Sequence, residues 1–217
     1  MRYLFFILIF LNSFFVLYSQ NTGKLDQLLD YANTDNVEGL KRLISQDSIS
    51  NFINFGDSQG HNALIIASQK GYKDIVLLLL SQNANVNLTC THGYTALIYS
   101  ANAGYIDIVS YLLAKNANPN IKVNAGTTAL IQAAGKGYYS IVDMMINAKA
   151  DLKISGIYND VNSDINYNMT PLMIAAFNNH DLIVKLLLER GSDINYINEN
   201  GANALFYSIA KGNNDIS

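Results

Sequence analysis

The chain has 217 residues, half of them hydrophobic, with 14 basic and 17 acidic side chains and a formal charge of -3 at pH 7. This slightly acidic balance, without a basic stripe along the helices predicted below, excludes a typical nucleic-acid-binding protein. The single cysteine, Cys90, excludes an internal disulfide and with it a disulfide-stabilised extracellular module.

The first residues predict export. An apolar run from Tyr3 to Val16 follows Met1-Arg2 and ends shortly before Ser19. A basic start, an apolar stretch and a small residue at the boundary are typical of a secretory signal, so residues 1–19 are predicted to be cleaved. The alternative is an uncleaved anchor of residues 3–18, although this run is shorter than the ~20 apolar residues that span a bilayer. Either way we expect a periplasmic or secreted array, and the lack of disulfides suits a bacterial envelope.

Beyond this segment the sequence repeats itself every 33 residues. The clearest sign is a five-residue opening that recurs as Gly60-His61-Asn62-Ala63-Leu64, Gly93-Tyr94-Thr95-Ala96-Leu97 and Gly126-Thr127-Thr128-Ala129-Leu130. A period of this length predicts stacked helical repeats, in which no repeat buries its apolar face alone.

Each repeat is predicted to hold a short first helix and a bulkier second helix. The first helices are predicted to begin after residues whose side-chain oxygen can accept a bond from a free helix N–H, namely Asn62, Thr95, Thr128, Thr170 and Asn203. They are predicted to end at residues that tolerate a left-handed conformation, namely Gly71, Gly104, Gly137, Asn179 and Gly212. A second left-handed residue is predicted two positions before each residue that caps the start of a first helix. These residues are Gly60, Gly93, Gly126, Asn168 and Gly201.

These signals divide the chain into consecutive segments. The interval from Leu130 to Leu172 is 42 residues, which places nine extra residues before the fourth regular repeat. The predicted segments are an atypical capping repeat (24–55), three regular repeats (56–88, 89–121 and 122–154), an inserted finger (155–163), a fourth repeat (164–196) and an incomplete last repeat (197–217). Because Asp215-Ile216 aligns with the start of the earlier second helices, residues after about Asn200 are predicted to be the least protected from hydrogen exchange.

From about residue 25 to residue 217, the repeated residues resemble the ankyrin repeat family. The resemblance implies an all-α repeat solenoid, with stacked helix-turn-helix units and β-hairpin-like loops, that binds proteins on a concave surface without catalysis. Three positions depart from the family pattern. The proline that follows the helix cap is retained only at Pro171 and is alanine in the other repeats. The histidine after the leucine is replaced by Ile65, Ile98, Ile131, Met173 and Phe206, and the glycine after the second helix by Asn83, Asn116 and Lys149. These departures predict reduced stability, lowest around the third and fourth repeats.

The resemblance also implies which residues bind a partner, because ankyrin partners contact the loop tips and the exposed side of the first helix. By position these residues are Gln59, His61, Gln69, Lys70, His92, Tyr94, Asn102, Thr127, Lys136, Tyr167, Met169, Phe177 and Asn178. Tyr94, Met169 and Phe177 are expected to be the anchors, because large apolar groups on an exposed face often dominate an interface. Ile157, Tyr158 and Val161 of the insertion are expected to extend this surface.

Two sets of residues suggest metal binding. Asp160-x-Asn162-x-Asp164 begins like a calcium loop, but Ile165 replaces the tight-turn glycine and Pro171 the bidentate glutamate, so a solvated finger is favoured. Cys90 and His92 would need His61 and a further ligand to complete a tetrahedral site. Exposed polar side chains without metal are the favoured interpretation of this second set.

The remaining alternatives concern the tyrosines and catalysis. Tyr72, Tyr105 and Tyr138 each follow a glycine that ends a first helix, and packing between layers is favoured over ligand contact. No set of nucleophile, base and orienting group can be assembled, so neither catalysis nor a cofactor is predicted.

Three functions stay open. A non-catalytic protein-binding module in an exported compartment is favoured. The alternatives are an inhibitor or immunity-type protector of an exported enzyme or toxin, and a small-molecule or metal carrier that uses Cys90, His92 and the tyrosines.

Overall fold

The protein is described by a computed structural model that covers residues 23–46, 49–159 and 166–212. The predicted signal, the Asp160-x-Asn162-x-Asp164 motif and the final Asp215-Ile216 lie outside the described residues. The chain divides into two compact parts, residues 1–85 and 86–217. Within the described ranges, no helix has the length and apolar character needed to cross a membrane.

The N-terminal part consists of two helical pairs and a connecting turn. Residues 23–33 are helical and pair with α2 (Val37–Gln46), and a short 3-10 helix (Ile49–Asn51) follows. The first regular repeat then contributes α3 (Ala63–Lys70) and α4 (Lys73–Ser81), and α4 packs against both α2 and α3. The predicted capping repeat is therefore a helical pair like the others, although it lacks their glycine-containing opening.

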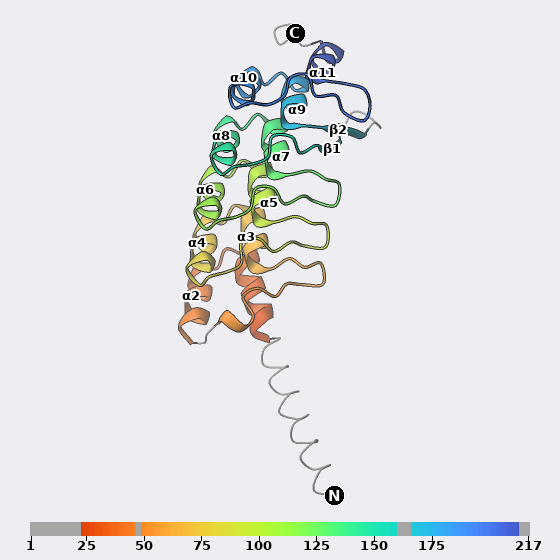
Figure 1. Cartoon of the computed structure of the whole chain (residues 1–217). Coiled ribbons are helices and arrows are strands. Elements are labelled where there is room, and N and C mark those ends of the chain that lie inside the picture. Colours follow the sequence, from red (N-terminus) through yellow and green to blue (C-terminus); the bar gives the residue numbers. More distant parts are fainter. Residues whose placement is uncertain (1–22, 47–48, 160–165, 213–217) are drawn as a thin grey trace, which may run out of the picture. The chain divides into compact units, whose positions relative to one another are not determined.

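The C-terminal part holds the remaining repeats. Its elements are α5 (Ala96–Ala103), α6 (Ile106–Ala114), α7 (Ala129–Lys136), α8 (Tyr139–Asn147), β1 (Gly156–Asn159), β2 (Asn166–Met169), α9 (Pro171–Phe177), α10 (Asp181–Glu189) and α11 (Ala204–Ala210). Figure 1 shows that the first helices α5, α7, α9 and α11 form one row and the second helices α6, α8 and α10 another. The loops extend from the row of first helices, on the side away from the second helices (Figure 1).

The predicted helix caps are confirmed. The side-chain oxygens of Asn62, Thr95, Thr128, Thr170 and Asn203 each accept a bond from the backbone N–H three residues later, at 2.9 to 3.4 Å. Each of these bonds satisfies one of the N–H groups that a helix start leaves without a partner. The predicted left-handed residues after the first helices are confirmed as well, at Gly71, Gly104, Gly137, Asn179 and Gly212.

The second helices are followed by residues other than glycine in the left-handed conformation, at the positions where the sequence predicted a poor fit. Asn83, Asn116 and Lys149 have φ values of 60°, 61° and 64°, in the left-handed region. Asparagine tolerates this conformation, whereas the Cβ of lysine crowds the following carbonyl. The backbone strain at Lys149 lies in the third repeat, where reduced stability was predicted.

The core of each layer is built from leucine, isoleucine and alanine side chains. In α7, the side chains of Leu130, Ile131, Ala133 and Ala134 are at most 1% exposed. Ile131 occupies the position of the family histidine, and its equivalents Ile65, Ile98 and Met173 are also at most 1% exposed. These four apolar replacements are therefore part of the core, where they contribute burial, whereas the fifth, Phe206, is 58% exposed.

The insertion forms a two-stranded antiparallel hairpin, which corrects one sequence prediction. β1 pairs with β2 so that Gly156 lies opposite Met169 and Ile157 opposite Asn168. Asn168 was predicted to be a left-handed turn residue, but it lies in an extended strand. The extra residues supply a partner strand here, so this loop does not repeat the tight turn of the other repeats.

Candidate protein interface

The regular loops share one backbone geometry. The glycine of each loop donates its N–H to the carbonyl three residues earlier at 2.8 to 2.9 Å, in the pairs Gly60–Asp57, Gly93–Cys90, Gly126–Val123 and Gly201–Asn198. Each of these glycines has a φ between 73° and 83°. A second bond closes each loop, from the first residue's N–H to the carbonyl four residues later, at 2.9 to 3.2 Å. Main-chain bonds therefore fix each loop and leave its outward side chains free to vary.

In the N-terminal part, Asp57 reinforces this loop. Its Oδ1 atom accepts the N–H groups of Gln59 and His61 at 2.8 and 2.9 Å, and the Nδ1 atom of His61 lies 3.4 Å from its Oδ2 atom. Partial burial alone would raise the pKa of Asp57, but the two N–H groups and the His61 ring outweigh it and lower this pKa below its ordinary value. The carboxylate form therefore stabilises the loop.

The predicted binding residues of this part lie on the loop and on the end of α3. Gln59, Gln69 and Lys70 are exposed, and His61 is half-buried. Lys70 donates from Nζ to the carbonyl of Asn33 at 3.1 Å. The outward side chain of Lys70 is thus tied to the capping repeat, whereas Gln59 stands on the loop tip.

In the C-terminal part, hydrogen bonds connect successive loops. Asn124 donates its N–H to the carbonyl of His92 and its side-chain amide to the carbonyl of Thr91, both at 3.1 Å. Ile157 of β1 donates its N–H to Ala125 at 3.0 Å. In the next layer, the side-chain amide of Asn198 donates to the carbonyl of Asn168 at 2.7 Å. These bonds hold the loops and the hairpin in one fixed row.

We call the outward side of this row, together with the free side of the first helices, the loop-helix face. Among its exposed residues in the second and third regular repeats and β1 are Thr91, His92, Ala103, Asn124, Ala125, Lys136 and Ile157. Tyr94, Asn102 and Asn178 are half-buried at its base. Lys136 is the one charged residue among these ten, so this part of the face is mostly neutral and polar.

Three residues predicted to bind a partner are buried instead. Met169 is 0% exposed, Thr127 2% and Phe177 7%. Thr127 donates its hydroxyl to the carbonyl of Ile157 at 2.7 Å, and the hairpin therefore covers it. The expected exposure of these three residues is wrong, because neighbouring elements that the repeat pattern does not specify cover them.

Phe177 packs against the next repeat, and Tyr167 is described by its backbone alone. The ring of Tyr207 meets Phe177 edge-on at 6.2 Å, and the ammonium group of Lys211 lies 4.4 Å from the centre of the Phe177 ring. Phe177 is thus an internal contact between α9 and α11. The backbone of Tyr167 lies in β2, and its side chain is outside the described residues.

Sequence reasoning missed Tyr99, which lies beside Tyr94 in the second regular repeat. The two rings stack with centroids 4.8 Å apart, and the hydroxyl of Tyr99 lies 4.0 Å from the Sγ atom of Cys90. Burial, the neighbouring Cys90 and Tyr94 together raise the pKa of Tyr99 to about 12. The 33-residue alignment could have suggested it, because Tyr99 and Tyr207 share a position.

The structure also corrects the expectation for Cys90. This side chain is 5% exposed, whereas exposed polar side chains were expected at Cys90 and His92. His92 is exposed, as expected. In the described part of the chain, no cluster of three or more His, Cys, Asp or Glu side chains could hold a metal ion.

Tyr138 and His180, which follow the glycine or asparagine after α7 and α9, pack between layers. A Cβ atom added to Gly104 would lie 2.8 Å from the Tyr138 ring, so that ring rests directly on the glycine. In the next layer, His180 covers Gly137 in the same way, and its Nε2 atom lies 3.2 Å from the carbonyl oxygen of Gly135. The packing role predicted for Tyr138 is confirmed.

Comparison with known proteins agrees with this architecture. The family model described as ankyrin repeats in three copies matches residues 19–90, 83–156 and 152–217. A search of curated proteins gave no match. Ankyrin repeats generally serve as protein-protein interaction modules and are typically non-catalytic. Because the matched ranges span most of the sequence, the chain belongs to the ankyrin repeat family.

Proposed function

We propose that this protein binds another protein through its loop-helix face, without catalysing a reaction. The observation that carries this proposal is the fixed row of loops in the C-terminal part. There, Thr91, His92 and Ala125 present their side chains outward, while the loop backbone is held by hydrogen bonds between repeats. A surface that is already ordered loses little conformational entropy when a partner binds.

The composition of the face indicates the kind of partner surface that fits it. Of the ten residues named above, only Lys136 is charged, and the last repeat adds the exposed Glu199 and Lys211 at equivalent positions, so opposite charges are few and nearly balanced. Complementary contacts would therefore be hydrogen bonds and small apolar contacts more than ion pairs. We expect an affinity that changes little between low and physiological salt, because screening acts on charges.

Arginine substitutions on opposite sides of the layers test this proposal. Ala103 and Ala125 are exposed on the loop-helix face, and Ala114 is exposed at the end of α6. We expect Ala103→Arg with Ala125→Arg to weaken partner binding at least tenfold, because long charged side chains would block the face. Ala114→Arg, alone or with Ser110→Arg, should leave it unchanged.

The measurement has two stages. The partner is first captured from an extract of the source cells and identified, and the affinity of the purified pair is then measured by titration for each variant. Equal binding by the Ala103→Arg/Ala125→Arg variant and the wild type would show that the proposed face is wrong. Loss of binding in the Ala114→Arg variant would instead place the partner on the second helices.

The compartment is part of the same proposal. We place the binding in an exported compartment, and the support is the basic start and the apolar run of residues 1–19. Cell fractionation, together with mass measurement of the mature protein, tests this location. We expect a chain that begins near residue 20 in the exported fraction. A chain found only in the cytoplasm with residues 1–19 intact would contradict it.

A further inference from the structure

In both parts of the molecule, an asparagine side chain joins one repeat to the next. The side-chain oxygens of Asn54, Asn87 and Asn120 each accept a backbone N–H of the following repeat, at 2.8 Å. The donors lie 31 residues further along the chain, at Asn85, Asn118 and Asp151. Each of these bonds satisfies a backbone donor at the junction between two repeats.

This pattern is interrupted between the third and fourth regular repeats. Lys153 occupies the position of Asn87 and Asn120, and a lysine side chain has no atom that accepts a hydrogen bond. The corresponding donor is the N–H of Asp193, which has no acceptor among the described residues. The junction therefore keeps a backbone donor that the other junctions pair.

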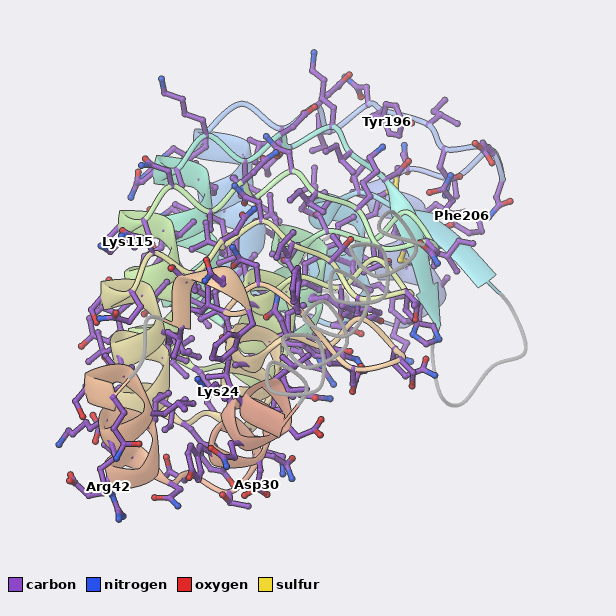
Figure 2. The ribbon with its side chains drawn as sticks, turned by 90° about the horizontal axis from the view of Figure 1, so that it is seen from below. Lys24, Asp30, Arg42, Lys115, Tyr196 and Phe206 are labelled. Atoms are coloured by element: carbon purple, nitrogen blue, oxygen red, sulfur yellow. The ribbon has the colours of Figure 1, made fainter. Side chains whose placement is uncertain are left out.

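A pocket with a volume of about 160 Å³ lies at this junction, in the C-terminal part. Its lining residues come from the segments after α8 and α10 and from the start of α9, namely Leu152, Lys153, Thr170, Leu172, Ser192, Asp193 and Tyr196. Tyr196 is labelled in Figure 2 and is 37% exposed. A cavity of about 150 Å³ holds a molecule the size of benzene, so this pocket has room for a ligand of about six to eight non-hydrogen atoms.

The pocket also holds a buried hydroxyl group that has no partner. Ser192 occupies a position where the three preceding repeats have buried alanines, Ala84, Ala117 and Ala150. The Oγ atom of Ser192 is buried, and no described residue forms a hydrogen bond with it. Buried polar groups in proteins are normally bonded, and one without a partner destabilises the fold. The serine therefore indicates that an atom from outside the described chain completes this site.

We propose that this pocket binds a small free amino acid. Three hydrogen-bond donors line it: the N–H of Asp193, the hydroxyl of Ser192 and the ammonium group of Lys153. A ligand carboxylate accepts from these groups and so replaces the asparagine oxygen that the other junctions have. Bonds between a carboxylate and a charged donor are among the stronger hydrogen bonds.

The remaining lining residues fit the rest of such a ligand. The carboxylate of Asp193 faces the ligand's ammonium group, because only its Oδ1 atom is occupied, by the N–H of Asn195 at 2.9 Å. Leu152, Leu172 and the ring of Tyr196 leave apolar walls for a short side chain. None of the residues named for the loop-helix face lines this pocket, so the proposal stands independently of the protein partner proposed above.

Titration of the isotope-labelled full chain with L-alanine, followed by NMR, tests the site. We expect saturable shifts of the Ser192 and Asp193 amide signals, with a dissociation constant of about 0.1–10 mM for so small a ligand. Sodium acetate supplies the carboxylate without the ammonium group and should bind at least tenfold more weakly. The absence of saturable shifts at ten times the upper value overturns the proposal, and equal binding of acetate overturns the assignment to an amino acid.

Two substitutions restore the residues of the other junctions. Lys153→Asn supplies an oxygen for the N–H of Asp193, so it should raise the melting temperature and weaken L-alanine binding at least tenfold. Ser192→Ala removes the hydroxyl and should weaken binding severalfold without lowering the melting temperature. Lys122→Asn is the matched control, because Lys122 is exposed, does not line the pocket and carries the same charge.

These variants locate the ligand as well as detect it. L-alanine should raise the melting temperature of the wild type and of Lys122→Asn, because a ligand stabilises the folded state that binds it. The rise should be much smaller in Lys153→Asn. Wild-type affinity in both Lys153→Asn and Ser192→Ala would place the ligand elsewhere and overturn the proposal, as would an equal loss in Lys122→Asn.

Discussion

The helices α7 and α11 occupy equivalent places in their repeats but have opposite environments. Both begin at an alanine after a side-chain cap, and both are followed by a left-handed glycine. Leu130 of α7 is 1% exposed, whereas Leu205 of α11 is 45% exposed. The local sequence therefore specifies the helix, and the neighbouring layer decides whether its apolar side is buried.

This difference agrees with the energetics of repeat proteins. In such arrays, each repeat contributes its own stability and an interface term with each neighbour. α7 packs against α5, α8 and α9, and α11 packs against α9. We therefore expect equivalent substitutions to be costly in α7 and mild in α11, and the following predictions test that contrast.

The largest contrast is expected for the central leucine of the first helix. Leu130→Ala removes a fully buried side chain and should lower the free energy of unfolding by about 2–5 kcal/mol. Leu205→Ala should lower it by about 1 kcal/mol or less, because nearly half of that side chain is already in water. Urea denaturation followed by circular dichroism measures both values. Equal losses would show that burial by the next layer is not what distinguishes the two helices.

The second contrast concerns the glycines after these helices. Gly137 and Gly212 have φ values of 79° and 80°, so alanine at either position costs about 1–2 kcal/mol in backbone strain. At Gly137 the new Cβ would also lie 2.7 Å from the His180 ring, whereas no described atom lies within 4 Å of the corresponding position at Gly212. Gly137→Ala should therefore be more destabilising by about 1 kcal/mol or more in the same denaturation experiment. A Gly212→Ala variant that loses as much stability as Gly137→Ala contradicts the contact with His180.

A gain in stability is expected at Lys149. This residue has a φ of 64°, in a conformation that glycine adopts without strain. Lys149→Gly should raise the free energy of unfolding by about 1 kcal/mol, which calorimetry would detect as a higher melting temperature. Asn116→Gly at the equivalent position of the preceding repeat is the control, and it should change stability by only a few tenths of a kcal/mol. If Lys149→Gly destabilises the protein, contacts of the lysine side chain outweigh the backbone strain.

The smallest expected effect is the loosening of the Asp57 loop at low pH, which the equivalent loop of Asn198 should not show. Both Oδ1 atoms accept two backbone N–H groups of their loop, but the amide of Asn198 does not titrate. Because folding lowers the pKa of Asp57, its contribution is complete above the ordinary carboxyl pKa of 3.8 and is lost as the pH falls through the lowered value. Amide exchange or chemical shifts of Gln59 and His61 should show this loop loosening in acid. Asp57→Asn should abolish that loosening, and a variant that still loosens at the same pH would assign the effect to another group.

The sequence predicted the features that depend on a few neighbouring residues. The side-chain caps such as Thr128 and the left-handed glycines such as Gly137 have local causes, and all of those checked above are confirmed, with Asn168 the exception. Asn168 differs because the inserted residues offered it a strand partner, and no periodic pattern encodes such a partner. The order of the helices followed from the 33-residue period in the same way.

The exposure of side chains was harder to predict than the helix caps, because exposure depends on residues that are far away in the sequence. Phe177 is covered by Tyr207 and Lys211 of the next repeat, and Thr127 by the hairpin. The uncovered side of α11 had one visible signal in the sequence, since Ile209 aligns with serine and alanine in the other repeats.

The most direct test of the central claim, that each layer is stabilised by the next, is native-state hydrogen exchange. The amides of α7 should open with a free energy close to that of global unfolding, and those of α11 with a much smaller one. Equal protection of α7 and α11 would contradict this claim.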